Sequence, residues 1–196
     1  MIHAPKLPKN LRISHGSHDN YGEGSCALEW VDLLDRKRRG ERILKSTKLT
    51  DSPACTCPVI AAFVRTWNDG FPDSEEGDTD RKRLIGPLLL PMLDTSSTRE
   101  VETQRAWMAT DWLARVHAPA FLELAGLGEH ARQLRGLAPL VDDASAGAAQ
   151  ASLSAARSAA ESAAVEALAP TVATIQKSAQ ALVLEMCVVG RGGEGT

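Results

Sequence analysis

The stretch of sequence that most constrains the fold runs from Ser97 to Leu127 and has the features of one long amphipathic helix. Ser97 can cap the helix, and Glu100, three residues later, can reach back to complete a capping box. The apolar residues recur at the helical spacings of seven, four and four; they are Val101, Met108, Trp112 and Val116. The charged residues fall largely on other faces: Arg99, Glu102, Arg105 and Asp111. With Gly126 as a stop signal, this stretch is predicted to be the central core helix.

The distribution of aromatic residues indicates where the core lies. All of them precede residue 122, whereas from about residue 143 onward packing must rely on Ala, Val, Leu and Ile. This shift in composition favours a boundary between a core with bulky side chains and a region of close helix–helix contact. We predict an all-α fold whose parts are an extended lead-in at 1–24, a helical bundle at 25–136, a long helical region at 139–190 and a flexible tail at 191–196.

The bundle is expected to open with a helix that Ser25 caps and that runs to about Arg39. Its sequence has a wide apolar surface on good helix formers. Gly40 interrupts the pattern, and the stretch 41–49 can add another turn or two of helix.

A second helix is predicted from the start signal Asp51-Ser52-Pro53 to Asn68, because Pro is tolerated in a first helical turn. Apolar side chains would lie in one line along it at Val59, Phe63 and Trp67. The acidic stretch 70–79 reads as a surface loop, since it contains both Gly and Pro. Shorter helices are expected at 80–85, 87–93 and 129–134.

The C-terminal region combines an Ala-rich segment with a heptad pattern. Half of the 26 positions from 144 to 169 are Ala, so helix propensity alone favours a long helix. A seam of a and d positions follows at alternating spacings of three and four: Val165, Leu168, Val172, Ile175, Ala179, Leu182, Met186 and Val189. Two arrangements satisfy this pattern, a helical hairpin or one helix kinked at Pro170. Because the flanking positions carry few charges, packing within the chain is favoured over self-association.

Overall charge and hydropathy exclude some classes of protein. A net charge of −3 leaves no global basic field for nucleic acid, so any such role must be local. No segment approaches the roughly 20 apolar residues that span a bilayer, and the start MIHAPKLPKN lacks an apolar run of signal-peptide length. We therefore expect a cytoplasmic protein with reduced thiols and no membrane contact.

One set of residues has the composition of a metal site. Two His and two Cys occur as the pairs His15-x2-His18 and Cys55-x-Cys57, and Cys26 is a further donor. A Cys3His set can hold structural zinc by joining two loops. The alternative is that the cysteines are buried without metal, because Cys-x-Cys is less typical of zinc than Cys-x2-Cys. No cofactor is expected, with structural zinc as the alternative.

Nothing in the sequence has a catalytic signature. A thiol-redox role for Cys55 and Cys57 lacks the βαβ context of that chemistry. His117, next to Pro119, is expected to be a half-buried helix residue. Glu29 and Asp111 are isolated carboxylates, which are usually capping or ion-paired surface groups. We therefore predict no catalytic residues.

A basic run places seven positive charges in thirteen residues. Such a cluster can bind phosphates or an acidic protein surface, or it can be a solvated helix end whose charge suits the helix dipole. No aromatic residue interleaves the run to stack on bases. Its members are Arg36, Lys37, Arg38, Arg39, Arg42, Lys45 and Lys48.

Three blocks carry a resemblance to a known group of proteins: SHGSHDNYGEGSCALEWV, SPACTCPVIAAFVRTWNDG and RAWMATDWLARVHAPAFLELAGL, followed by the Ala-rich end and LAPTVATIQKSAQALV. The chain resembles uncharacterised helical proteins from actinobacteria and their phages over most of residues 5–190. It departs from them at 36–49, where the basic run replaces a shorter, less basic connection. The resemblance implies a helical fold and association with a phage or mobile element, and it carries no established function.

These features favour a non-enzymatic interaction or scaffold protein that uses helical surfaces to contact a protein partner or a second copy of itself. The alternative is a metal-stabilised module that binds nucleic acid through the basic run.

Overall fold

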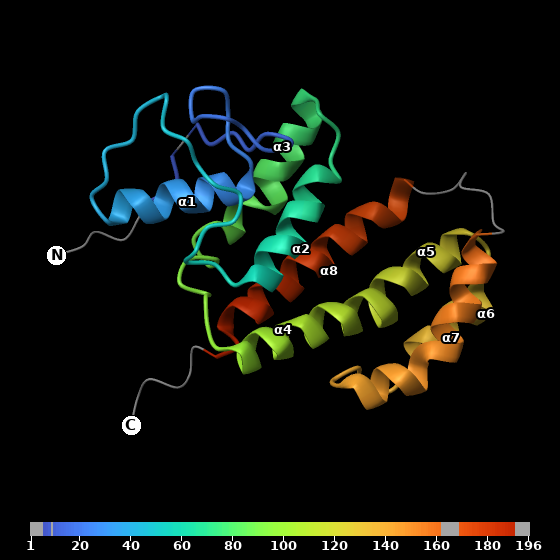
Figure 1. The fold of residues 1–196 in the computed structure, drawn as a ribbon. Helices are drawn as coiled ribbons and strands as arrows, with labels where there is room; N and C mark the ends of the chain where they lie inside the picture. The colour runs from blue at the N-terminus through green and yellow to red at the C-terminus, as the bar shows by residue number, and fades with distance from the viewer. Residues whose placement is uncertain (1–5, 9, 162–168, 191–196) are drawn as a thin grey trace. The chain divides into compact units, whose positions relative to one another are not determined.

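The computed structural model describes residues 6–8, 10–161 and 169–190, and within these ranges the chain forms helices and no strand, so the fold is all-α as predicted. Figure 1 shows the order of the elements along the chain. They are α1 (Ala27–Arg38), α2 (Pro58–Asp69), α3 (Glu75–Leu84), the short 3-10 helix η1 (Gly86–Leu88), α4 (Arg99–Trp112), the π-helical turn η2 (Leu113–His117), α5 (Ala118–Leu124), α6 (Gly128–Arg135), α7 (Asp143–Glu161) and α8 (Ala169–Val188). Among the described residues no helix is long and apolar enough to cross a bilayer.

The chain divides into two compact units. The first comprises Met1–Glu102 with Val183–Thr196, and the second comprises Thr103–Leu182. The division falls inside α4 and inside α8, so it does not coincide with the predicted domains 25–136 and 139–190. Each unit is described separately below.

In the first unit, α1 begins one residue later than predicted, with Cys26 rather than Ser25 at the N-cap. The reason is Glu29, whose carboxylate accepts a hydrogen bond from the Cys26 N–H at 2.8 Å and so completes a capping box. The helix is buried from Ala27 to Asp35, and Gly40, with φ +79°, ends it as expected.

The predicted extra helical turns at 41–49 are wrong. This segment instead contains a turn in which the Thr47 N–H donates to the Leu44 carbonyl at 2.9 Å. Two backbone bonds join it to the lead-in, from Gly22 N–H to the Lys45 carbonyl at 2.8 Å and from Tyr21 N–H to the Thr47 carbonyl at 3.0 Å. These hydrogen bonds occupy the carbonyl groups of Lys45 and Thr47, which a helix would have paired with its own N–H groups. The contact with the lead-in therefore takes the place of the predicted helical turns.

The second predicted helix starts later than its start signal suggested. Residues 51–57 form turns, and α2 begins at Pro58 because the Cys57 N–H is taken by the Thr95 hydroxyl at 3.0 Å. The predicted apolar line is only half-buried. The buried face of α2 lies beside it, at Ile60, Ala61, Val64 and Asn68.

The acidic stretch 70–79 is helical in its second half, contrary to prediction. Ser74 caps α3 by accepting a hydrogen bond from Gly77 N–H at 3.2 Å, and the carboxylates of the first turn suit the positive end of the helix dipole. A side chain at position 77 is excluded, because a Cβ there would lie 2.0 Å from the Pro72 carbonyl oxygen.

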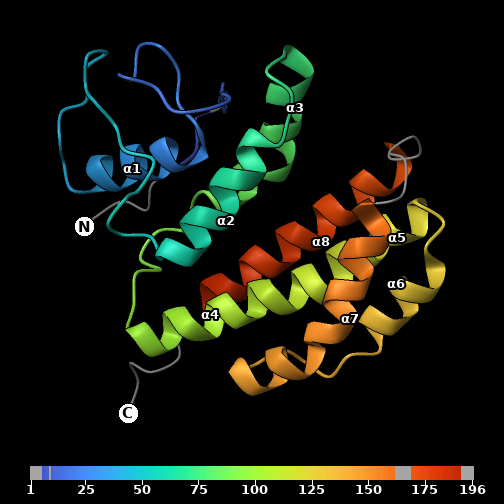
Figure 2. The same cartoon turned by 45° about the vertical axis from the view of Figure 1, so that its right-hand side comes forward.

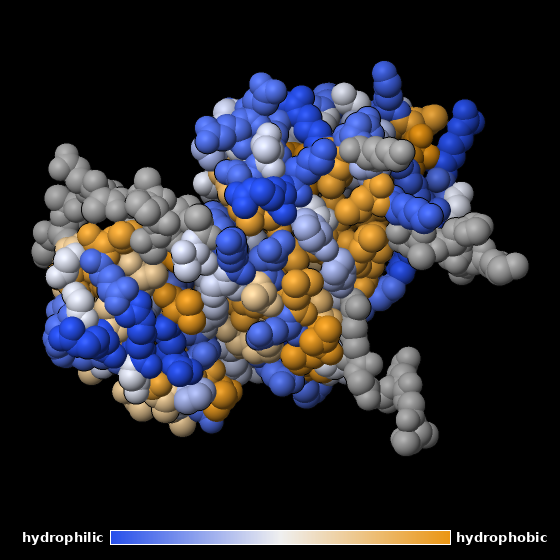
Figure 3. Space-filling view, turned by 180° about the vertical axis from the view of Figure 1, so that it is seen from behind, coloured by the Kyte–Doolittle hydropathy of each residue, from blue (hydrophilic) through white to orange (hydrophobic). Residues whose placement is uncertain are grey.

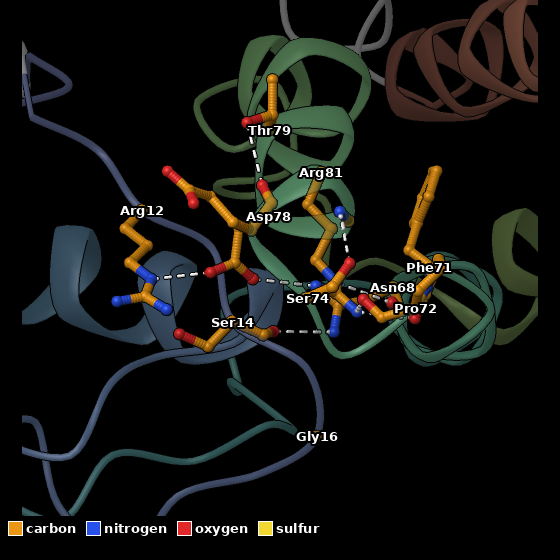
Figure 4. Close-up of polar contacts among 12 residues, drawn as sticks. Arg12, Ser14, Gly16, Asn68, Phe71, Pro72, Ser74, Asp78, Thr79 and Arg81 are labelled. Carbon is orange, nitrogen blue, oxygen red and sulfur yellow. Dashed lines mark hydrogen bonds and ion pairs between the residues drawn. The ribbon is translucent and has the colours of Figure 1, made fainter.

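A buried arginine joins the end of α2 to α3, as Figure 4 shows. Arg81 is fully buried and donates to the carbonyl oxygens of Asn68 at 3.0 Å, Phe71 at 2.7 Å and Pro72 at 3.0 Å. Its charge is balanced by Asp78 at 2.9 Å. One side chain therefore bonds three carbonyls at the end of α2 and in the following loop. Two of these also accept a backbone N–H, Asn68 from Phe71 at 3.4 Å and Pro72 from Ser74 at 3.0 Å.

The lead-in is attached to this network on its other side. Arg12 Nε lies 2.7 Å from an Asp78 oxygen, and the Asn68 side-chain amide donates to the Ser14 carbonyl at 3.1 Å (Figure 4). Ile13, between these two anchors, is fully buried. These contacts place the chain that follows, including His18, beside the start of α1.

The predicted central helix, most of which belongs to the second unit, is a continuous helical run interrupted by a π turn. α4 begins at Arg99, so Thr98 rather than Ser97 precedes it. The π turn η2 lies just before Pro119, and the Ala118 N–H bonds to the Leu113 carbonyl. Proline lacks an N–H and crowds the carbonyl four residues earlier, and a widened turn relieves both problems. The run ends at Gly126, with φ +74°, as predicted.

The buried face of this run differs from the prediction. Trp112 is buried as expected, but Arg105, predicted on a polar face, is 1% exposed, and Val116, predicted in the core, is 40% exposed. The actual core face of α4 is formed by Arg105, Ala109 and Trp112. The wider η2 turn rotates the following side chains relative to an ideal α-helix, so Ala114 is buried and Val116 turns to solvent.

Small residues form the core between α5, α6 and α7, which lie side by side in Figures 1 and 2. Alanine in the predicted Ala-rich helix α7 allows close approach, as expected from the composition. One cluster joins Leu122, Ala131, Leu134 and Ala156, and a second joins Ala114, Leu140 and Ala149.

The heptad seam is partly visible. Val165 and Leu168 lie outside the described residues, as does the side chain of Val172. The connection 162–168 also lies outside them, so the choice between hairpin and kinked helix stays a prediction. The described seam residues Ile175, Ala179, Leu182 and Met186 are buried, and Val189 is half-buried.

Candidate functional site

The basic run is divided by its ion pairs. At the end of α1, Arg36 binds Asp32 at 2.9 Å, and Arg39 binds Asp35 at 3.3 Å and Glu41 at 3.0 Å. Asp32 and Asp35 are buried carboxylates of the same helix, each four residues, or about one turn, before the arginine that it binds. These two arginines therefore neutralise charges of their own helix end.

Arg38 is held more strongly. It forms an ion pair with Asp35 at 2.7 Å and a two-bond pair with Asp94, which raises the pKa of the guanidinium above its usual value. Asp94 adopts a left-handed backbone conformation, with φ +57°, which a non-glycine residue rarely adopts. This pair ties the end of α1 to the segment that precedes α4.

The other four cations of the run are exposed and form no ion pair with any described residue. They are Lys37, Arg42, Lys45 and Lys48. Leu44, between two of them, is 49% exposed. We call Lys37, Arg42, Leu44, Lys45 and Lys48 the basic loop surface. The structure thus divides the basic run into three arginines that form ion pairs within the protein and four cations that are available to a partner.

A polar cavity of about 640 Å³ lies beside this surface, at the start of α1. Lys48 and Arg36 border it on the side of the basic run. The cavity is lined by Ser17, His18, Asp19, Glu23, Glu29, Arg36, Lys48, Leu49, Thr50 and Asp51.

The inner wall of the cavity contains a histidine–glutamate pair in which the carboxylate is buried and the imidazole is half-buried. Glu29 is 1% exposed, and one of its oxygens, Oε2, lies 2.8 Å from both His18 Nδ1 and the Cys26 N–H. The other oxygen accepts the His18 backbone N–H at 2.7 Å. A buried carboxylate is stable only when it is hydrogen-bonded in this way. The position of Glu29 at the N-terminus of α1 adds favourable interaction with the helix dipole.

This pair fixes the orientation of the imidazole. When the ring is neutral, Nδ1 carries the proton that is donated to the carboxylate, and Nε2 is left as a hydrogen-bond acceptor. No described residue is hydrogen-bonded to Nε2. Gly24, with φ +136°, keeps the adjoining space open, because a Cβ there would lie 3.0 Å from both Nε2 and the Ser14 hydroxyl. A carboxylate bonded to Nδ1 also orients the histidine of many acid–base sites, and the His18–Glu29 pair has the same hydrogen-bonding arrangement.

Glu29, predicted to be an isolated surface carboxylate, is instead buried and paired with His18. The signal that could have identified it is the spacing Cys26-x-x-Glu29, which is a capping-box spacing shifted by one residue from the predicted cap. Its pairing with His18 had no local signal, since the lead-in reaches α1 only through tertiary contacts.

The predicted metal ligands are not gathered into one site. His15 is exposed, His18 binds Glu29, and Cys26 and Cys57 are the buried N-caps of α1 and α2. Within the described ranges no three His, Cys, Asp or Glu side chains form a group that could hold a metal ion. The zinc alternative therefore stays a sequence prediction without a geometry that supports it.

The thiols also lack an activating environment. Burial raises the pKa of Cys26 to about 12, and burial likewise raises the pKa of Cys55 above its ordinary value. All four cysteines are free thiols. Nucleophilic or redox thiols need the opposite shift, so Cys26 and Cys55 have the properties of structural residues.

His117 lies between two aromatic rings, 5.2 Å from Trp112 and 4.7 Å from Phe121 between ring centroids. Burial lowers its pKa. It is a packed residue of the π turn η2, in agreement with the expectation of a half-buried helix histidine.

Exposed apolar side chains are the remaining surface feature. Figure 3 shows hydrophobic and hydrophilic residues interspersed over one face of the molecule. The large apolar side chains with substantial exposure are Leu44, Leu113, Val116, Val141, Leu184 and Val188.

Comparison of the chain with protein-family models, with curated proteins and with solved structures gave no match. The resemblance to actinobacterial and phage proteins accordingly stays a prediction.

Proposed function

We propose that this chain is a non-enzymatic interaction protein that binds an acidic protein segment through the basic loop surface. The observation that carries the proposal is the division of the basic run, in which three arginines are neutralised within the fold and four cations are not. Unpaired surface cations attract an oppositely charged partner with little desolvation cost.

An acidic protein segment suits this surface better than nucleic acid for two reasons. Leu44 is half exposed among the cations and offers an apolar contact, which a phosphate backbone does not use. The surface also has no aromatic side chain on which a base could stack. Three of the seven basic residues, including Arg38, have their charge engaged by carboxylates, which weakens the field that nucleic acid would meet.

The seam of α8 is not the surface that we propose for partner binding, since the sequence already favours its packing within the chain. Ile175, Leu182 and Met186 are buried within the chain, so these side chains are not available as an oligomer interface in this conformation. This supports contact through the basic loop surface rather than through a coiled coil.

The proposal can be tested with defined probes and the full chain. Fluorescence anisotropy would measure the affinity of the full chain for three labelled probes: a peptide of Glu and Leu residues, a Glu-only peptide of equal charge, and a short DNA duplex. The salt concentration would be about 0.1 M, where the Debye length is about 10 Å. We expect the Glu/Leu peptide to bind most tightly, and Leu44→Ser to weaken that peptide several-fold without affecting the Glu-only peptide.

A matched pair of triple variants provides the control. Replacing Lys37, Arg42 and Lys45 with Ser should weaken peptide binding about tenfold, since each exposed charge pair contributes up to about 1 kcal/mol. Replacing three exposed cations elsewhere with Ser removes the same charge and should have little effect; these are Lys6, Lys82 and Lys177. Equal losses in both variants, or tighter binding of the DNA duplex, would contradict the proposal.

A further inference from the structure

The polar cavity at the start of α1 shares only Lys48 with the basic loop surface, and its lining has features of a ligand site. Glu29 and the His18 ring are held in place by three hydrogen bonds, so the inner wall is preorganised. A volume of about 640 Å³ accommodates a small molecule.

The groups that face the cavity and have unused hydrogen-bonding capacity are mainly acceptors. His18 Nε2 is an acceptor in the neutral ring and bonds no described residue. Asp19 is an exposed carboxylate that forms no ion pair with any described residue. Glu23 accepts a side-chain hydrogen bond, from the Asn20 amide, on only one of its two oxygens. Asp51, in contrast, is engaged by Arg65 at 3.2 Å.

The charges of the lining favour a cation. Four carboxylates line the cavity, against two cations; Asp51 is paired with Arg65, which leaves three carboxylates. Of the two cations, Arg36 is already neutralised by Asp32 at 2.9 Å, which leaves Lys48 as the one lining cation without an ion pair among the described residues. The field in the cavity is therefore net acidic, and a ligand anion would meet repulsion from the acidic rim.

From these observations we propose that the cavity binds a small organic ammonium ion that carries N–H or O–H donors, such as a diamine or an amino sugar. The donors would bond to His18 Nε2 and to the rim carboxylates Asp19 and Glu23. A donor group is needed as well as the charge, because the rim carboxylates are hydrogen-bond acceptors that a quaternary ammonium cannot satisfy.

The test uses the full chain and probes of defined chemistry. Putrescine and glucosamine carry both charge and donors, choline carries charge without donors on nitrogen, glucose is neutral and citrate is an anion. Titrations would be followed through the ring nitrogen resonances of His18 in the ¹⁵N-labelled protein, in parallel with calorimetry. We expect saturable shifts of the Nε2 signal with putrescine or glucosamine, and affinities at least about tenfold weaker for choline, glucose and citrate.

Two variants assign the site. His18→Phe removes the imidazole and should weaken the binding of putrescine or glucosamine about tenfold. Asp19→Asn removes a rim charge and should weaken the binding of the same amines several-fold. Asp19 is exposed, so its variant tests the proposal even if His18→Phe does not fold. The matched control is His15→Phe, at an exposed histidine outside the lining.

Three results would overturn the proposal: no shift of His18 with either amine, equal affinity for choline or citrate, or amine binding that survives both variants. Because Lys37, Arg42 and Lys45 lie outside the cavity lining, their triple variant should retain amine binding. Failure of the acidic-peptide experiment and failure of the amine experiment are therefore distinguishable.

Discussion

His18 Nδ1 lies 2.8 Å from Glu29 Oε2, and this bond joins an irregular lead-in to the first turn of the first helix. Glu29 thereby has two roles. It caps α1 through the Cys26 N–H, and it anchors the chain that lines the polar cavity.

Substituting Glu29 with Gln should therefore destabilise the protein. Three N–H donors converge on the two carboxylate oxygens, and a side-chain amide offers only one acceptor oxygen to them. We expect Glu29→Gln to lower the free energy of unfolding by about 1–3 kcal/mol, measured by urea denaturation. Glu76→Gln, in the first turn of α3 but exposed, is the control and should change stability by less than about 0.5 kcal/mol. Equal effects of the two substitutions would show that the buried pair has no special role.

Arg81 should tolerate no replacement, lysine included. Its planar guanidinium reaches three carbonyl oxygens and Asp78 at once, whereas a lysine ammonium has neither the span nor the geometry to bond all four. Arg81→Lys is expected to cost about 2–4 kcal/mol, because it breaks several charge-assisted hydrogen bonds of a fully buried side chain. The neighbouring Arg83 is 58% exposed, and Arg83→Lys should be nearly neutral. Denaturant titration of both variants checks this, and a loss below about 1 kcal/mol for Arg81→Lys would contradict it.

Glycine substitutions should have opposite effects at two positions. Gly24 has φ +136°, and a Cβ there would lie 3.0 Å from two side-chain atoms, so Gly24→Ala is expected to cost about 1–3 kcal/mol. Gly147 lies within α7 with no atom within 4 Å of its would-be Cβ. Gly147→Ala should stabilise the protein by about 0.5–1 kcal/mol through helix propensity. Thermal unfolding of the two variants distinguishes these outcomes, and a stable Gly24→Ala protein would refute the first.

Stability should fall on mild acidification because of His117. Burial lowers its pKa in the folded protein below the ordinary value of 6.5, so the unfolded chain binds a proton more readily. The stabilising effect of a neutral His117 is complete above about pH 6.5 and is lost as the pH falls toward the lower, folded pKa. Unfolding free energies measured from about pH 7.5 to 5 should decline less steeply in His117→Phe than in the parent protein. An identical slope in the two proteins would exclude His117 as the cause.

Local sequence signals predicted most helix positions, because their physical causes act over a few residues. Gly40 and Gly126 end their helices as predicted, and the Ala-rich composition predicted α7. The errors occurred where a distant group competes for a local hydrogen bond. The segment 41–49 bonds to the lead-in instead of forming helix, and the Cys57 N–H bonds to Thr95 instead of extending α2 toward Pro53.

Which polar residues are buried was decided by tertiary structure alone. Arg81 and Arg105 belong to a residue type that is usually exposed, and no periodicity distinguishes them from exposed arginines such as Arg83. Their burial depends on partners that the fold brings to them, as the carbonyls at the end of α2 are brought to Arg81.

The candidate surfaces show the same division. The sequence by itself determined that the chain is helical and that it carries seven cations between residues 36 and 48. Only the tertiary structure decided which of these cations are available, because Asp94 reaches Arg38 from a distant segment. The tertiary structure also decided which histidine has a fixed orientation, because the folded lead-in brings His18 to Glu29. Helix formation follows from short-range propensity and capping, whereas charge pairing and burial follow from contacts between segments far apart in the chain.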